Sequence, residues 1–118
     1  MNLILVSLGG FFGAITRYLM GVKFNQPQNY KPYGTWIANI LGSILLGLML
    51  VFLGNEQISS QLWALLGVGF CGSFTTFSTF GVETLSMVID GQYKKATLYV
   101  ISSIFLSMLI VWCIIILL

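Results

Sequence analysis

Ten consecutive residues, 72–81, combine five hydroxyl side chains with three phenylalanines and have a glycine at each end. Thr is a mediocre helix former and Gly a poor one, so a break is expected within the apolar segment that holds this run. In a membrane, a break leaves backbone carbonyls that protein, ion or water must satisfy. Such carbonyls bind cations in the discontinuous helices of transporters. The alternative is a continuous helix whose Ser and Thr side chains bond to their own backbone.

Two of these phenylalanines, Phe77 and Phe80, suggest a second kind of chemistry. An aromatic ring is positive at its edge, so a ring edge can face a small anion without a formal charge that would trap it. An isolated phenylalanine in a membrane helix usually just packs. Phe77 and Phe80 stand among hydroxyl groups, which indicates a role with an anion.

Two further apolar segments each carry a stripe of uncharged polar side chains spaced four residues apart, which places them on one helix face. The stripes are Thr35, Asn39 and Ser43 in one segment, and Tyr99, Ser103 and Ser107 in the other. Such groups can be interhelical hydrogen-bonding contacts, which are common in membrane bundles. Two matched stripes instead indicate a hydrated or ion-lined track.

Two charged residues, Arg17 and Glu83, lie within apolar segments. Arg17 either extends to the membrane interface or supplies a fixed positive charge in an aqueous vestibule. Glu83 is either a proton carrier, a vestibule wall, or a partner of Arg17 or a lysine. The Gly9 and Gly13 pair, four residues apart, predicts close helix packing.

The elements that position these residues are membrane-spanning helices. Of the 118 residues, 58% are apolar and only 7% charged, against roughly a quarter charged in soluble domains. A helix needs ~20 residues to cross the hydrocarbon core. We therefore predict an all-α integral membrane protein with one domain, 1–118, and a third helix broken near its middle. Its four spans are expected at about 3–22, 35–54, 62–89 and 98–118.

The connections are short, and their lysines lie on one side of the membrane. That side holds Lys23, Lys31, Lys94 and Lys95, with Arg17 just inside it, whereas the 54–61 connection has neither Lys nor Arg. The positive-inside rule predicts cytoplasmic lysine-bearing loops and outside termini.

Several function classes are excluded or disfavoured. The chain has no histidine, no phosphate-binding loop and no GxSxG pattern, so no enzyme is indicated. The net charge of +2 and the lack of a basic run argue against nucleic acid. Cys71 and Cys113 stand in apolar stretches without metal-ligand spacing, and we expect neither a disulfide nor a metal site from them.

Three motifs together resemble the bacterial fluoride channels, the Fluc or CrcB family. They are Gly9-Gly10-x-x-Gly13-Ala14-x-x-Arg17-Tyr18, Gly34-Thr35-x-x-x-Asn39-x-x-Gly42-Ser43, and Gly69-x-x-Gly72-x-x-Thr75-Thr76-Phe77-Ser78-Thr79-Phe80. The third is highly specific, and the resemblance covers the whole chain.

The resemblance implies an antiparallel dual-topology dimer with two fluoride pores in the bacterial plasma membrane, through which fluoride leaves the cytoplasm passively. Its pore residues would be Asn39, Thr76, Phe77, Thr79, Phe80, Tyr99, Ser103 and Ser107. Arg17 would lie in a vestibule, and the backbone carbonyls of Gly72 and Thr75 would hold a structural sodium ion at the dimer centre. Uncharged donors suit fluoride passage, since conduction requires weak, multi-site binding.

The lysine bias departs from this expectation, because a chain that inserts in both orientations should have almost none. A homodimer is expected, with a heterodimer of oppositely oriented homologues as the alternative. The alternative function is a proton-coupled small-solute exporter with Glu83 as proton carrier. A third possibility is an assembly subunit of a larger complex, which leaves the two polar stripes unexplained.

Overall fold

The computed structural model describes residues 3–29 and 31–118. Within them, four helical segments are long and apolar enough to cross a membrane, which confirms the all-α, four-span prediction. Three are continuous: α1 (Leu3–Phe24), α2 (Tyr33–Gly54) and α6 (Tyr93–Leu117). The third span, Ser60–Ile89, is divided into α3 (Ser60–Leu62), the π-helix η2 (Trp63–Cys71), α4 (Gly72–Phe74) and α5 (Ser78–Ile89).

The helices extend beyond several predicted bounds. The clearest difference is α6, which begins at Tyr93 rather than at 98, because its polar first turn continues the helix into the connection. Between α1 and α2 the chain forms β1 (Asn25–Gln26), the 3-10 turn η1 (Pro27–Asn29) and β2 (Lys31–Pro32). The two short strands pair antiparallel, with Asn25 opposite Pro32.

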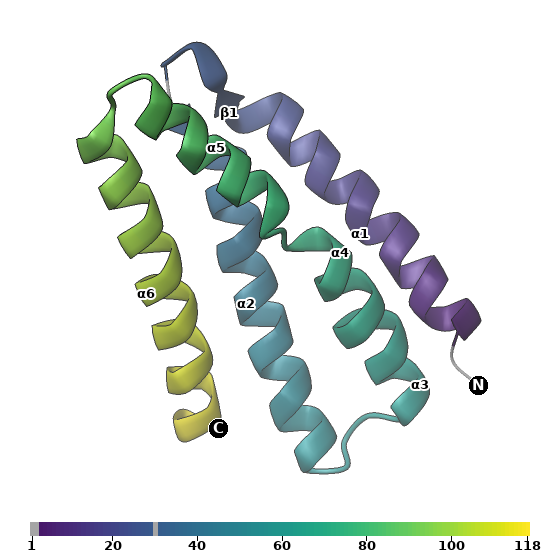
Figure 1. Ribbon diagram of the computed structural model, residues 1–118. Coiled ribbons are helices and arrows are strands. Elements are labelled where there is room, and N and C mark those ends of the chain that lie inside the picture. The colour runs from purple at the N-terminus through teal and green to yellow at the C-terminus, as the bar shows by residue number, and fades with distance from the viewer. Residues whose placement is uncertain (1–2, 30) are drawn as a thin grey trace.

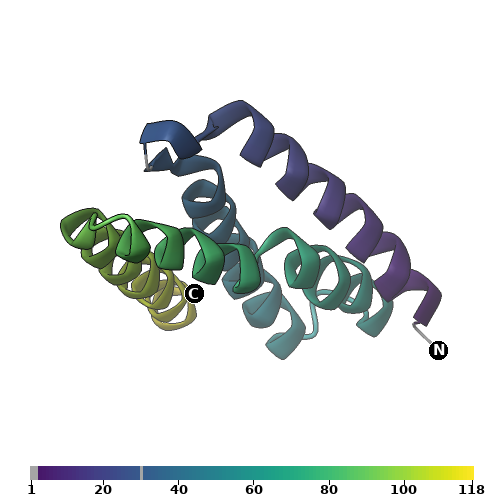
Figure 2. The same cartoon turned by 45° about the horizontal axis from the view of Figure 1, so that its top comes forward.

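The four spans form a slab whose extents are 48 × 31 × 19 Å. Helices α1 and α6 lie at opposite edges, and α2 and the third span lie between them (Figures 1 and 2). The start of α1 and the end of α6 are at the same end of the slab, near the connection between α2 and α3. The opposite end holds β1 and the turn between α5 and α6.

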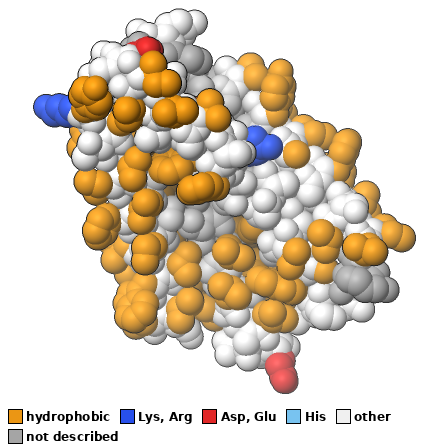
Figure 3. All heavy atoms as spheres, viewed as in Figure 1, with side chains coloured by type: hydrophobic (Ala, Val, Ile, Leu, Met, Phe, Trp, Pro, Cys, Tyr) orange, Lys and Arg blue, Asp and Glu red, His pale blue; other side chains and the backbone are white. Residues whose placement is uncertain are grey.

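Large apolar side chains cover much of the outer surface (Figure 3). Along α6, for example, Phe105, Met108 and Trp112 are 70%, 68% and 64% exposed. Charged groups are sparse on the face that Figure 3 shows. Such a surface suits hydrocarbon rather than water, and the chain is a multi-pass membrane protein.

Glycine allows α1 to pack closely on the third span. A Cβ atom at Gly9 would overlap the carbonyl oxygen of Leu65, and one at Gly13 would overlap Ser73 Oγ. A Cβ atom at Gly69 on the facing helix would lie 2.6 Å from the carbonyl oxygen of Val6. The prediction of close packing at Gly9 and Gly13 is therefore confirmed. The same contact places Arg17, four residues beyond Gly13, beside α4.

The turn between α5 and α6 depends on one glycine. Gly91 has φ of +77°, in the left-handed region that glycine adopts without steric cost. Its N–H donates to the carbonyl of Val88, and the N–H of Gln92 donates to that of Met87. These bonds satisfy the last carbonyls of α5 and turn α6 back along α2.

The glycine contacts predict a contrast between two neighbouring positions. Gly9→Ala should lower stability by about 1–3 kcal/mol, since its methyl group meets fixed backbone. Gly10→Ala is the matched control, because the nearest atom to its Cβ, the Gly69 carbonyl oxygen, lies at an ordinary 3.9 Å. Thermal unfolding in detergent compares the two variants. Equal melting temperatures would contradict the packing described here.

Candidate functional site

The helix of the third span is interrupted at residues 75–77, between α4 and α5. Thr75 has φ of −82° and ψ of 154°, which is extended backbone. The N–H of Thr75 still bonds to the carbonyl of Cys71 at 3.1 Å. Beyond it, the pattern of main-chain bonds between residues four apart is interrupted until the N–H of Gly81 reaches Phe77 O at 2.8 Å.

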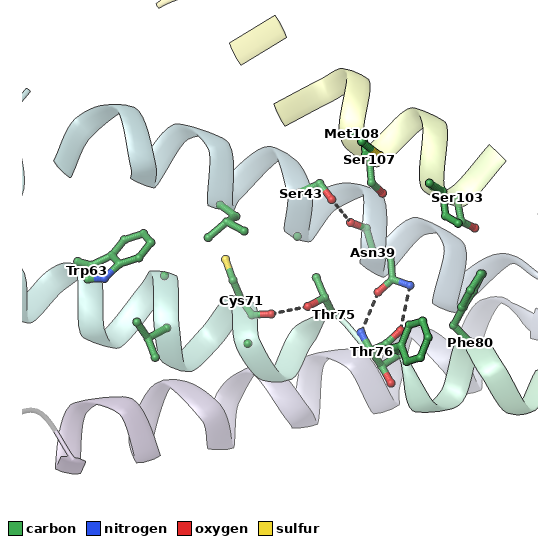
Figure 4. A pocket seen from close by; sticks show the side chains of 17 residues that line it. Asn39, Ser43, Trp63, Cys71, Thr75, Thr76, Phe80, Ser103, Ser107 and Met108 are labelled. Carbon is green, nitrogen blue, oxygen red and sulfur yellow. Dashed lines mark hydrogen bonds between the residues drawn. The ribbon is translucent and has the colours of Figure 1, made fainter. Parts of the chain in front are cut away.

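Asn39, in the first half of α2, binds both main-chain groups of Thr76. Its Oδ1 accepts from the N–H of Thr76 at 2.8 Å, and its Nδ2 donates to the carbonyl of Thr76 at 3.2 Å (Figure 4). In a continuous helix the N–H of Thr76 would bond to the carbonyl of Gly72. The Asn39 side chain thus replaces backbone hydrogen bonds that the helix loses at the interruption. It is also an interhelical contact between α2 and the third span. The second hydrogen on Nδ2 remains for another acceptor.

Two other side chains also bond to backbone groups near residues 75–77. Thr76 Oγ1 accepts from the N–H of Thr79 at 3.2 Å, the geometry of a helix N-cap, and so starts α5. Arg17 Nε donates to the carbonyl of Ser73 at 2.9 Å, near the end of α4. Three groups from α1, α2 and the interruption itself therefore satisfy backbone atoms that the interruption frees.

An open groove of about 600 Å³ runs beside the interruption. Figure 4 shows its walls, which come from α2, the third span and α6. Its lining includes these predicted site residues: Asn39, Gly72, Thr75, Thr76, Phe77, Phe80, Ser103 and Ser107. Charged side chains do not line it among the described residues. The groove joins most of the predicted permeation residues with both predicted sodium ligands.

The two phenylalanines differ in their surroundings. Phe77 is 84% exposed, the most exposed of the large apolar side chains in the described chain. Phe80 is partly buried, with its ring 4.9 Å from Tyr99 and 6.1 Å from Phe77 between centroids. Phe80 is thus held in the fold, whereas Phe77 projects from it.

Ser103 presents a buried hydroxyl without a hydrogen bond. The residue is 6% exposed, and its Oγ has no partner among the described residues. Its neighbour Ser102 differs, because its Oγ accepts from Trp36 Nε1 at 3.0 Å and donates to the carbonyl of Tyr99 at 3.3 Å. Buried polar groups are nearly always paired, so the lone Ser103 hydroxyl beside the groove indicates a missing partner.

The structure separates Tyr99 from the groove, although Tyr99 shares a helix with Ser103 and Ser107. Its hydroxyl donates to Glu83 Oε1 at 2.9 Å, and Thr35 Oγ1 donates to Glu83 Oε2 at 3.2 Å. The partners of Glu83 in the described chain are neutral, so the structure contradicts the alternative in which Glu83 pairs with Arg17 or a lysine. Tyr99 and Thr35 can both reach Glu83 because α6 and α2 pack against each other and α5 lies against α6.

Sequence reasoning missed Asn25, which links α1, α2 and α5. Its Oδ1 accepts from the N–H groups of Gly34 and Thr35 at 2.7 and 3.2 Å and so caps α2. Its Nδ2 lies 3.3 Å from Thr35 Oγ1 and 3.4 Å from Glu83 Oε2. Asn25 stands eight residues before the helix start that it caps, so no local capping pattern marked it.

Arg17 and Thr79 line a different cavity, of about 400 Å³, together with Asn25 and Thr35. Arg17 is half-buried, and its Nε is engaged by Ser73. The other nitrogens of the guanidinium carry further N–H donors. The structure therefore gives Arg17 a fixed contact with the backbone, a role that neither sequence interpretation included. Its remaining N–H donors can bond to groups in the adjacent cavity.

Comparison with known proteins identifies the family. Residues 4–115 match the family described as CrcB-like protein, Camphor Resistance (CrcB). The chain belongs to this family. A protein of Oceanobacillus iheyensis named as the fluoride-specific ion channel FluC is 45% identical over 107 residues, 90% of this chain and 82% of that relative. A FluC of Shewanella baltica is 42% identical over 112 residues, 94% of this chain and 90% of the relative.

The family resemblance predicted from the three motifs is therefore confirmed. A third relative, from Shewanella sp. strain ANA-3, is also 42% identical over 112 residues and has the same name. These CrcB relatives are named as ion channels and not as enzymes.

The double hydrogen bond of Asn39 predicts a strong effect of its removal. Asn39→Leu keeps the size of the side chain but leaves the N–H and carbonyl of Thr76 without partners, at a cost of about 2–3 kcal/mol. Ser43→Ala is the control, since within residues 3–29 and 31–118 Ser43 Oγ bonds only to its own helix, at the Asn39 carbonyl. Thermal unfolding measures both, and a Leu variant as stable as the Ala control would contradict this assignment.

Proposed function

We propose that the chain is a fluoride channel that lets fluoride leave the bacterial cytoplasm passively, as an antiparallel dual-topology homodimer with two pores in the plasma membrane. The names of the CrcB relatives support fluoride as the transported ion. The observation that carries the proposal is the uncharged groove in which Asn39, Phe80 and the unpartnered hydroxyl of Ser103 come together.

The chemistry of the groove suits a small, strongly hydrated anion. The free N–H of Asn39 and the hydroxyls of Ser103 and Ser107 are neutral donors that can replace water around fluoride. The ring edges of Phe77 and Phe80 add positive potential without a formal charge. Binding by such groups is weak and distributed, and this permits rapid passage.

The exposure of Phe77 supports a pore made by two protomers. A ring that is 84% exposed beside an open groove leaves one wall of the pathway unbuilt in the single chain. A second protomer seated on this face would supply the wall and cover Phe77. Thr79 and Tyr99, which lie outside the groove toward Thr35, would extend the pathway at that side.

The backbone at the interruption fits a sodium ion bound by the carbonyls of Gly72 and Thr75. In a continuous helix these carbonyls would accept from the N–H groups of Thr76 and Thr79, but those N–H groups bond to Asn39 Oδ1 and Thr76 Oγ1. Both residues line the groove, and a Cβ at Gly72 would have open space around it. Bound sodium would balance the carbonyl dipoles, as in other discontinuous membrane helices.

Ion flux tests the proposal directly. Liposomes that hold only this purified protein should release fluoride much faster than chloride, without a proton gradient. Phe80→Ile should reduce fluoride efflux at least about tenfold, which corresponds to ~1.4 kcal/mol of barrier. Equal passage of chloride would contradict the assigned track. Efflux that stops without a proton gradient would instead support an exporter with Glu83 as proton carrier.

Two neighbouring serines of α6 allow a matched comparison. Ser103→Ala should preserve or raise the melting temperature, because it removes a buried hydroxyl that has no partner, and should reduce fluoride efflux about tenfold. Ser102→Ala should lower the melting temperature and leave efflux close to wild type, because its hydroxyl serves Trp36. Parallel unfolding and efflux measurements compare the two. The reverse pattern would contradict the role of Ser103.

A further inference from the structure

The segment before the interruption has two faces with different neighbours. Gly72 and Thr75 line the groove. Ser73 lies between them in sequence but faces α1, where its Oγ donates to the carbonyl of Gly10 at 2.7 Å. Because Gly13 has no side chain, α4 and α1 approach closely enough for this contact.

Arg17 also contacts α4 from the α1 side. Its Nε donates to the carbonyl of Ser73 in α4 at 2.9 Å. Arg17 is the one charged residue among those described whose side chain bonds to the backbone of α4. A continuous helix would supply that carbonyl with the N–H of Phe77, which the interruption has moved away. The guanidinium also stands at the C-terminal end of the helical stretch Ser60–Phe74, where a positive charge is favourable.

Four of the carbonyls near the interruption therefore form two pairs. Those of Ser73 and Thr76 are occupied by Arg17 and Asn39, from α1 and α2 respectively. Among the described residues, the carbonyls of Gly72 and Thr75 receive neither a side-chain donor nor the N–H that a continuous helix would supply. Each occupied carbonyl directly follows a free one along the chain, so its contact restrains the backbone next to that free carbonyl.

We propose that Arg17 is a positioning residue for the cation site, because its Nε holds the Ser73 carbonyl toward α1 and leaves the Gly72 and Thr75 carbonyls directed to the groove. This inference rests on the proposed sodium site. This role of Arg17 depends on the N–H donor at Nε. A vestibule residue that attracts anions needs only a positive charge.

Three substitutions separate the donor from the charge. Arg17→Gln keeps an N–H donor at the same place, since Arg Nε and Gln Nε2 are both attached to Cδ, and removes the charge. Arg17→Lys keeps the charge but moves the donor one bond further out. Arg17→Met puts a methyl group at the position of Nε and removes both.

The measurement is thermal unfolding of the purified protein in detergent over a series of sodium concentrations, with ionic strength held by choline chloride. A ligand that binds only the folded state raises the melting temperature with its concentration. Wild type and Arg17→Gln should reach half of the sodium-dependent rise within about threefold of the same concentration. Arg17→Met and Arg17→Lys should need about tenfold more sodium, the effect expected from loss of a hydrogen bond to a charged group.

Lys23→Gln is the control, because it removes a positive charge near the end of the same helix, where Lys23 Nζ lies 5.3 Å from the ring of Phe24. Its sodium dependence should match wild type. The inference is overturned if Arg17→Gln behaves like Arg17→Met, or if all three Arg17 variants match wild type. A wild type that shows no sodium-dependent rise overturns the sodium site and this inference together, while fluoride efflux from liposomes would still decide the channel function separately.

Discussion

The reciprocal hydrogen bonds between Asn39 and Thr76 are the contact on which the rest of the structure depends. An unpaired backbone group in hydrocarbon costs several kcal/mol, so a membrane helix can be interrupted only where another group replaces its lost bonds. The carboxamide supplies an acceptor and a donor that match the N–H and carbonyl of a single residue. It therefore allows the helix to be interrupted at residues 75–77 in the middle of the third span, and it also holds α2 against that span.

Other contacts at the interruption follow from this one. Because Asn39 occupies the N–H of Thr76, the side chain of Thr76 can start α5 by accepting from Thr79. On the opposite side, Arg17 satisfies the Ser73 carbonyl, and Gly13 allows α1 to come close enough. Small residues in α1 and polar side chains from two helices thus surround one short stretch of irregular backbone, the arrangement that membranes tolerate.

The groove beside the interruption is largely apolar and holds a few uncharged polar groups, because the charged groups of the spans are engaged elsewhere. Arg17 contacts the α1 side of α4, and Glu83 accepts from Tyr99, Thr35 and Asn25. The groove has an amide, several hydroxyls and two phenylalanine rings among apolar side chains such as Leu46, Trp63 and Met108. Such a surface offers donors to an anion but holds no fixed charge that would retain it.

Composition and local pattern determined the four spans, the class of protein, the family motifs and the close packing at Gly9 and Gly13, because each depends on residues adjacent along the chain. The spacing of Tyr99, Ser103 and Ser107 likewise predicted a shared helix face. Only the tertiary structure decided that Tyr99 donates a hydrogen bond to Glu83 and that the Ser103 hydroxyl lacks a partner among the described residues. It alone revealed Asn25 as the cap of α2. Periodicity specifies which face of a helix a side chain occupies, but the packing distance and rotation of the neighbouring helices determine what that side chain meets.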